Sequence, residues 1–243
     1  MATETPSEQI RALKTAAKNQ RDRGIRGYPR AEALLREAIA IGEAELRSSS
    51  VPERRVEMAA ELSDSYGVIG GVQRRWADET AGAEHEEHLK SSIRAYDDGF
   101  GYESDPQYGL VNSYNLVNRL LVRLIWDPEA LAAQRQVVID GTTPALNLAA
   151  ELDEAAATVR GQLAGKRRGD HWAMADLALL ELLLERGSAA SAYADFVDAS
   201  PRDFEYESAL ATVRPLASLP LASAESLRDA VNLLEDRLKR LRS

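Results

Sequence analysis

Signals for the beginning of a helix recur along the whole chain, while the alternating apolar and polar runs of half-buried strands are missing. Pro29, Pro52, Pro106 and Pro128 each stand where a helix can begin, because proline is tolerated in a first turn. These signals divide the chain into eleven predicted helices, 7–23, 29–47, 52–79, 84–103, 106–126, 128–139, 144–164, 170–186, 188–199, 203–218 and 223–241. The sequence therefore predicts an all-α protein with short connections.

Composition supports this fold class and excludes several classes of function. The 243 residues include 39 alanines and 31 leucines, which favour helices. The chain has no cysteine, so a disulfide framework, a thiolate zinc site and a cysteine nucleophile are excluded. The net charge of −9 argues against general nucleic-acid binding. We therefore expect no nucleic-acid partner, no metal and no cofactor.

The chain carries no segment that predicts a membrane location. Its longest apolar stretch, 177–184, is far shorter than the roughly 20 residues that a membrane-spanning helix needs. The first six residues include an acid and no apolar core, unlike a secretory signal. We expect a cytoplasmic protein, and the excess of Arg over Lys suggests a GC-rich bacterial genome.

Two stretches show the residue spacing of helical repeats. Ala31, Leu35 and Ala38 follow the small, bulky, small pattern of the second helix of a tetratricopeptide repeat, and the stretch 172–201 echoes it more loosely. Small side chains let neighbouring helices approach, and bulky ones fill the space between repeats. The predicted architecture is an α-α superhelix of degenerate tetratricopeptide-like helix pairs, one domain over 1–243. An irregular helical bundle is the alternative.

Three motifs are more specific than a generic repeat. They are AELSDSYGVIGG at 60–71, followed by RRW at 74–76; AYDDGF at 95–100, followed by the segment 108–118 with NSYNLVN; and GDHWAMADL at 169–177. Their order resembles the tetratricopeptide-like TRAF-binding domain, which lies beside the catalytic domain in apoptosis signal-regulating kinase kinase kinases and has bacterial relatives. The resemblance covers about 55–215. It implies an α-solenoid scaffold that binds proteins, with no catalytic residues, and this chain lacks the kinase domain.

One predicted helix carries a narrow polar strip opposite a wide apolar face. At 100° per residue, Asn112, Asn115, Arg119 and Arg123 fall within one sector of the segment 110–125. Amides and guanidinium groups can hydrogen-bond a peptide backbone or a carboxylate. We predict that these four residues line a concave partner-binding groove, although neighbouring helices or solvent could equally satisfy the strip.

Two further residues, Tyr66 and Trp172, complete the predicted groove. Both lie in the motifs that carry the resemblance. Trp172 opens a predicted helix after Asp170, its expected cap. It can serve either as an aromatic anchor for a partner or, as we favour, as a packing residue between repeats.

Small residues and histidines form two more patterns. The predicted helix at 52–79 has a stripe of small residues, which favours close packing of another helix over a bend at Gly70 and Gly71. His85 and His88 lie three residues apart rather than the four of the zinc-protease motif, so a solvated helix start is favoured over a metal site.

The last predicted helix has a heptad seam, Leu227, Val231, Leu234, Leu238 and Leu241. We predict that 223–241 caps the helical array, with a weak homodimer through this seam as the alternative to a monomer. The leading functional hypothesis is a non-catalytic scaffold or adaptor in bacterial signalling or defence, which binds a protein or peptide. The alternative is a ligand-sensing regulatory domain with a nucleotide or peptide in its groove. No set of residues predicts an enzyme.

Overall fold

The computed structural model describes residues 4–243, and 75% of the chain is helical. The described residues form twelve α-helices and almost no strand, so the predicted all-α, solenoid-like fold is confirmed. The chain divides into two compact units, Met1–Val122 and Arg123–Ser243. The boundary lies inside helix α5 (Tyr114–Trp126), where the sequence carries no break. The single domain over 1–243 stays a prediction, because this division does not test whether either unit folds alone.

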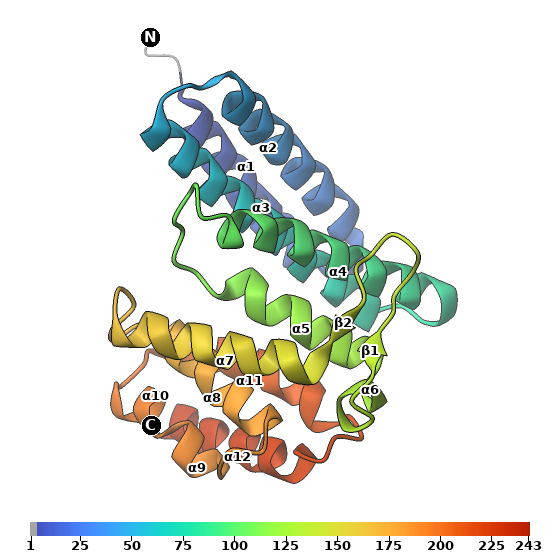
Figure 1. Ribbon diagram of the computed structural model, residues 1–243, viewed down its shortest axis with the longest axis vertical. Coiled ribbons are helices and arrows are strands. Elements are labelled where there is room, and N and C mark those ends of the chain that lie inside the picture. Colours follow the sequence, from blue (N-terminus) through green and yellow to red (C-terminus); the bar gives the residue numbers. More distant parts are fainter. Residues whose placement is uncertain (1–3) are drawn as a thin grey trace. The chain divides into compact units, whose positions relative to one another are not determined.

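The first unit is built from long helices that each pack on the next (Figure 1). Its elements are α1 (Pro6–Arg21), the short 3-10 helix η1 (Gly24–Arg26), α2 (Tyr28–Ser48), α3 (Pro52–Asp78), α4 (Gly82–Ser104) and the first part of α5. A proline lies in the first turn of α1, α2 and α3, as the sequence predicts for α2 and α3. Helix α1 also contacts α3, so three helices enclose one core.

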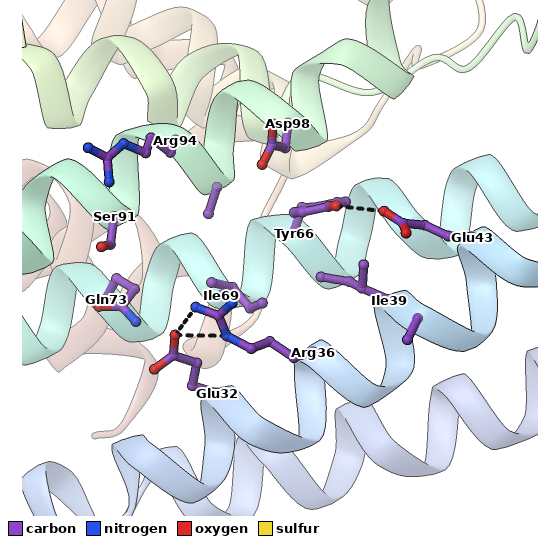
Figure 2. Close-up of a pocket in the computed structure, with 12 residues that line it drawn as sticks. Glu32, Arg36, Ile39, Glu43, Tyr66, Ile69, Gln73, Ser91, Arg94 and Asp98 are labelled. Atoms are coloured by element: carbon purple, nitrogen blue, oxygen red, sulfur yellow. Dashed lines mark hydrogen bonds and ion pairs between the residues drawn. The ribbon is translucent and has the colours of Figure 1, made fainter. Parts of the chain in front are cut away.

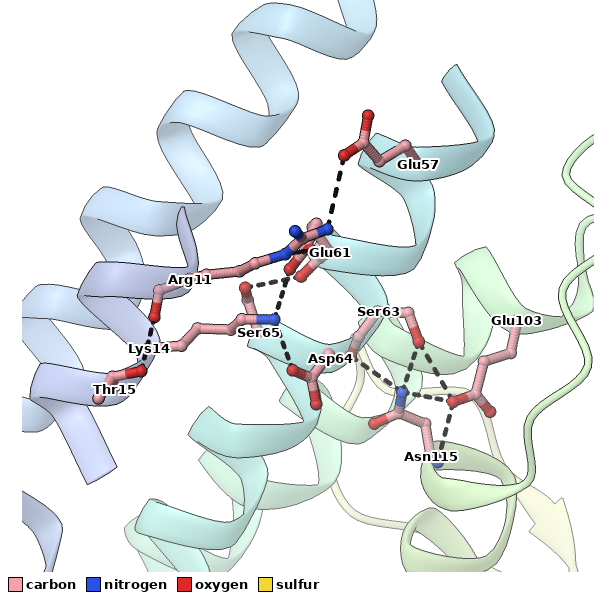
Figure 3. A network of polar contacts seen from close by, with 10 residues as sticks. All are labelled: Arg11, Lys14, Thr15, Glu57, Glu61, Ser63, Asp64, Ser65, Glu103 and Asn115. Carbon is pink, nitrogen blue, oxygen red and sulfur yellow. Dashed lines mark hydrogen bonds and ion pairs between the residues drawn. The ribbon is translucent and has the colours of Figure 1, made fainter. Parts of the chain in front are cut away.

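Buried aliphatic side chains from these helices form the core of the first unit. Leu35, Leu62, Val72 and Ile93 are among its most deeply buried residues. One polar cluster joins α1 to α3 beside this core: the Lys14 ammonium lies 2.5 Å from Glu61 Oε2 and 2.6 Å from Asp64 Oδ2 (Figure 3). Pairing of the buried ammonium offsets the cost of removing it from water.

The second unit consists of shorter helices. Its elements are the rest of α5, α6 (Glu129–Ala132), β1 (Gln136–Val137), β2 (Leu146–Asn147), α7 (Leu148–Ala164), α8 (His171–Leu183), α9 (Ala189–Ala192), α10 (Ala194–Asp198), α11 (Asp203–Ala217) and α12 (Ala224–Leu241). Helix α7 packs on α8, and α11 packs on α12. The Asp170 carboxylate accepts a hydrogen bond from the Ala173 N–H at 3.1 Å, so the predicted cap of α8 is confirmed.

A short β-hairpin replaces part of two predicted helices. Strands β1 and β2 pair antiparallel, with Val137 opposite Leu146, where the sequence predicted helix through 139 and again from 144. Helix α6 ends near Gln134, whose φ of 51° is incompatible with a right-handed helix. The β-branched run 137–139 then favours extended backbone. The prediction of helices over 128–139 and from 144 is wrong here.

Helix α5 begins at Tyr114, eight residues after the predicted start at 106. Asp105 forms a turn instead, in which its carboxylate accepts the Gln107 N–H at 2.9 Å. Gly109 follows with φ +58°, a conformation that favours glycine. The segment before α5 is therefore irregular.

The last helix packs as predicted within its own unit. Leu227, Leu234 and Leu238 are buried, and α12 contacts α11 and α9. Leu241, the final residue of the seam, is exposed. Packing of 223–241 on the preceding helices is therefore confirmed. Among residues 4–243, no helix combines the length and apolar character needed to cross a membrane.

Candidate functional site

The first unit contains a pocket of about 440 Å³ between α2, α3 and α4 (Figure 2). We call it the α2–α4 pocket. Helices α2 and α4 both pack on α3 and supply its walls, and α3 lies between them. Its lining residues are Glu32, Arg36, Ile39, Ala40, Glu43, Tyr66, Ile69, Gln73, Ser91, Arg94, Ala95 and Asp98.

Helical periodicity explains why these residues line one pocket. On α2 the lining residues recur at intervals of three or four from Glu32 to Glu43, and the same spacing relates Ser91 to Asp98 on α4. On α3, Tyr66, Ile69 and Gln73 contribute the middle of the lining. Each helix thus turns one face toward the same space. None of these faces is strongly apolar, so periodic hydrophobicity does not reveal the pocket.

The two ends of the α2–α4 pocket differ in chemistry (Figure 2). At one end, hydrogen-bond donors gather from Arg36, Gln73, Ser91 and Arg94, and the Glu32 carboxylate lies beside Arg36. At the other end lie the carboxylates of Glu43 and Asp98 and the hydroxyl of Tyr66.

Contacts with neighbouring side chains hold Gln73 and Arg36 of the donor end in place. Gln73 Oε1 lies 2.7 Å from His88 Nδ1, and the His88 ring stacks on Trp76 with ring centroids 4.1 Å apart. With its oxygen used in this way, Gln73 has its amide NH₂ as a donor. Arg36 Nη2 lies 2.6 Å from Glu32 Oε1, an i,i+4 pair between two residues of the pocket lining.

At the acidic end, Tyr66 and Glu43 contact each other. The Tyr66 hydroxyl donates a hydrogen bond to Glu43 Oε1 at 3.1 Å. Burial and the Glu43 carboxylate both raise the pKa of Tyr66, so the phenol stays protonated and serves as a donor. Glu43 also has Arg47 at 3.5 Å on its outer side.

Asp98 is the second carboxylate of this end. Burial, followed by the nearby carboxylates of Asp97 and Glu43, raises the pKa of Asp98. All three causes oppose its charge.

Of the six residues predicted to line a groove, Tyr66 lines this pocket. Asn115 and Arg123 are fully buried, so the prediction that they face a partner is wrong. Arg119 is half-buried, with its guanidinium carbon 3.9 Å from the centre of the Phe100 ring. Asn112 accepts hydrogen bonds from the N–H groups of Ser113 and Tyr114 at 2.8 and 3.2 Å, at the start of α5.

Asn115 is buried because it joins α5 to α3 and α4 (Figure 3). Its amide nitrogen lies 3.0 Å from the Ser63 carbonyl oxygen and 2.8 Å from Glu103 Oε1. The Glu103 carboxylate also accepts the N–H groups of Asn115 and Leu116, both at 3.2 Å, and so caps α5. The polar strip of the helical wheel is thus a packing surface.

Close contact between these helices depends on glycines. A Cβ added to Gly99 would lie 2.6 Å from Asn115 Cγ, and one added to Gly67 would lie 2.6 Å from the Tyr114 ring. At Gly70 it would lie 2.8 Å from the Tyr96 ring. Helix α3 continues through Gly70 to Asp78, so the close-packing interpretation of the small-residue stripe is confirmed.

Trp172 belongs to the second unit and is 40% exposed. Its ring centroid lies 6.0 Å from that of Phe204, which is 47% exposed. Arg202 covers the Phe204 ring, with its guanidinium carbon 4.4 Å from the centroid. Trp172 thus contacts α11 and also remains accessible, which leaves both of its predicted roles open.

The side chains of His85 and His88 both contact α3. His85 Nδ1 lies 2.8 Å from the Ala77 carbonyl oxygen, and His88 reaches Gln73 as described above. Over residues 4–243, no group of three or more His, Cys, Asp or Glu residues is arranged to hold a metal ion.

In comparisons with known proteins, no family model, curated protein or solved structure matches the chain.

Proposed function

We propose that this protein is a non-catalytic adaptor and that the α2–α4 pocket binds a peptide segment of its partner. The observation that carries the proposal is the pocket itself, which is lined by both hydrogen-bond donors and carboxylates. A peptide offers carbonyl and carboxylate acceptors as well as N–H and cationic donors, so it can complement both ends. Tyr66 adds an aromatic face of the kind enriched in protein interfaces.

The proposal moves the binding site from α5 to α2, α3 and α4. Asn115 and Arg123 are buried, whereas the rim of the pocket is accessible: the side chains of Arg36 and Arg94 are 72% and 44% exposed. The resemblance to the TRAF-binding domain adds the proposal that the partner belongs to a bacterial signalling or defence system. No reaction is assigned to the chain.

Selection from a random peptide library, displayed on phage and presented with the full chain, tests this proposal. Enriched peptides should bind the wild-type protein and lose affinity when Ala40→Trp fills the pocket. Ala40 is exposed and lines the pocket, so the new indole should enter it without disturbing the core.

Ala60→Trp is the matched control, because Ala60 is an exposed alanine of α3 outside the pocket. Equal loss of peptide binding in both variants, or in neither, would place the binding site elsewhere. A library that yields no binding peptide would contradict the peptide-binding function.

A ligand-sensing regulatory domain is the second candidate function. The volume of about 440 Å³ lies within the roughly 300–1,000 Å³ of small-molecule sites. A rise in melting temperature with a zwitterionic small molecule, abolished by Ala40→Trp, would favour this sensor over the adaptor.

A further inference from the structure

A second group of polar side chains lies on the face of α3 that carries Gly71, away from the α2–α4 pocket. A Cβ added to Gly71 would lie 3.5 Å from the Tyr96 hydroxyl oxygen and 3.7 Å from that of Tyr114, so both phenols end at this position. Arg74 and Arg75 follow three and four residues later, and residues at these spacings share a helix face. Two guanidinium groups and two hydroxyls from α3, α4 and α5 therefore lie close together. We call this place the Arg74 site.

Helix α1 brings a third guanidinium to the Arg74 site. It ends at Arg21 and packs along α3. Burial lowers the pKa of Arg75, and the Arg21 and Arg74 guanidinium groups lower it further, because like charges oppose one another. Burial raises the pKa of Tyr114, and the same two arginines act against this rise. Arg21 and Arg74 thus lie near both Arg75 and the Tyr114 hydroxyl.

Two carboxylates offset part of this positive charge. Asp22 Oδ1 lies 2.8 Å from Arg21 Nη2 and 3.8 Å from Arg75 Nη1, and the Asp22 side chain is 59% exposed. Burial raises the pKa of Asp78, and the Arg74 guanidinium acts in the opposite direction. Asp22 therefore occupies the outer side of Arg21 and Arg75, whereas Asp78 acts on Arg74 through its charge.

Two more acids border the Arg74 site and are engaged by other groups. Glu79 accepts hydrogen bonds from the Tyr28 hydroxyl and from the Ile25 N–H, the latter at 3.1 Å. Asp64 lies 2.6 Å from the Lys14 ammonium. These contacts hold both carboxylates in place beside the site.

The Arg74 site has unused hydrogen-bond donors. Among residues 4–243, Arg74 Nε is buried and has no hydrogen-bond partner. The Tyr96 and Tyr114 hydroxyls are hydrogen-bonded to each other, which uses one of their two protons and leaves the other to donate. A buried donor without an acceptor is unfavourable, so an acceptor from outside the chain would be stabilised here.

An oxyanion has the chemistry that these donors require. Its oxygens accept hydrogen bonds, and its charge offsets the repulsion among the three guanidinium groups. Because the donors come from different helices, they approach from different directions. This arrangement suits the tetrahedral oxygens of phosphate better than the two coplanar oxygens of a carboxylate. The residue Tyr114 is 41% exposed and the Arg75 side chain is 46% exposed, so a small anion can reach the site.

We propose that the Arg74 site binds a phosphate group, as free phosphate or as the phosphate of a small monoester. Arg74 and Arg21 contact its oxygens, and the remaining hydroxyl proton of the Tyr96–Tyr114 pair donates to one of them. Arg75, which Asp22 already contacts, contributes its charge. The site lies on another face of α3 from the α2–α4 pocket, so this proposal does not depend on peptide binding.

Isothermal titration calorimetry of the full chain with sodium phosphate, in chloride buffer at constant ionic strength, tests the proposal. Phosphate should bind with a saturable heat. Arg74→Gln should weaken binding by about tenfold or more, because a hydrogen bond between charged groups is lost. Arg228→Gln is the matched control: it removes the same charge from an exposed position of α12, and it should change the affinity by less than about twofold.

Melting temperatures in phosphate-free buffer separate binding from a structural role. Arg74→Gln should melt no lower than wild type there, since the substitution removes an unpaired donor and relieves repulsion between arginines. Phosphate should raise the melting temperature of wild type and of Arg228→Gln, and it should raise that of Arg74→Gln much less. If Arg74→Gln does not fold, Arg21→Gln on α1 provides the same comparison and should also weaken phosphate binding.

Glycerol 3-phosphate is the second probe, and it identifies the source of the phosphate group. Tighter binding than that of inorganic phosphate supports a monoester, and weaker binding supports the free ion. The proposal is overturned if acetate binds as tightly as phosphate, or if millimolar phosphate gives no saturable heat. Equal phosphate affinity in wild type and Arg74→Gln, or equal loss in Arg74→Gln and Arg228→Gln, would also overturn it.

Discussion

At the scale of single residues, the contact between Gly99 and Asn115 decides how α5 packs. The helical wheel correctly finds that Asn115, Arg119 and Arg123 share a sector, but a wheel cannot tell which polar sector a neighbouring helix covers. The answer lies in Gly67 and Gly99, on two other helices, which leave room for the Asn115 side chain. A polar residue stands at position 115 because its amide bonds to Ser63 and Glu103, and not because it faces a partner.

Replacing Gly99 by Ala tests this contact. The new Cβ would lie 2.6 Å from Asn115 Cγ, so the amide must move and its hydrogen bonds must weaken. We expect Gly99→Ala to lower the free energy of unfolding by about 1–3 kcal/mol, the usual cost of overpacking. Urea denaturation measures the change.

Gly101→Ala on the same helix provides the matched control, because a Cβ at Gly101 meets nothing within 4 Å. Alanine suits a helix better than glycine, so Gly101→Ala should raise the free energy of unfolding by about 0.5–1 kcal/mol. Equal stabilisation by both substitutions would contradict the close contact.

At the scale of elements, the sequence predicts helix existence well because proline and capping residues act locally. The prediction of element boundaries fails where contacts between residues far apart in the sequence determine them. The start of α5 depends on the Glu103 carboxylate from α4, and the β-hairpin depends on pairing of Val137 with Leu146. The α2–α4 pocket was missed apart from Tyr66, because Glu43 and Asp98 look like ordinary surface acids until three helices are placed together.

The beginning of α11 gives a pH-dependent prediction. The Arg202 guanidinium and backbone N–H, together with His171, hold the pKa of the buried Glu205 at about 2, below its ordinary value of 4.5. The folded state thus favours the carboxylate, so the resulting stability is complete above pH 4.5 and is lost as the pH falls toward 2.

Glu205→Gln should therefore lower the melting temperature at pH 7, and the difference from wild type should shrink as the pH falls from 4.5 to 2. Thermal unfolding, followed by circular dichroism between pH 7 and pH 2, measures this difference in melting temperature. Glu207→Gln, an exposed position of the same helix, should change the melting temperature much less at every pH. A pH-independent effect of Glu205→Gln would refute the carboxylate's role.

The seam of α12 gives a second test at this scale. Leu234 is fully buried and Leu241 is 52% exposed, although both belong to the same heptad pattern. We expect Leu234→Ala to lower the free energy of unfolding by about 2–5 kcal/mol and Leu241→Ala to change it little. Urea denaturation measures both. Similar costs at both positions would show that the end of the seam is covered in solution.

At the scale of the whole molecule, the seam of α12 bears on association. Since Leu227, Leu234 and Leu238 are already buried within the chain, they are not available to a second copy. We therefore expect a monomer of 26.6 kDa in sedimentation equilibrium. Reversible dimerisation that depends on Leu234 would support the homodimer instead.

Truncation after Pro220 extends this prediction. Removing α12 uncovers apolar residues of α11, so the shortened chain should aggregate or melt at a clearly lower temperature. A truncated chain that stays monomeric with an unchanged melting temperature would show that α12 is dispensable for the fold.

The contact of Gly67, Gly99 and Asn115 also limits how this sequence can change over evolution. A side chain at position 99 requires a smaller residue at position 115, and one at position 67 requires Tyr114 and Asn115 both to give way, so these positions should change together rather than singly. We therefore expect relatives of this chain either to keep Gly, Gly and Asn at these positions of α3, α4 and α5 or to change them together.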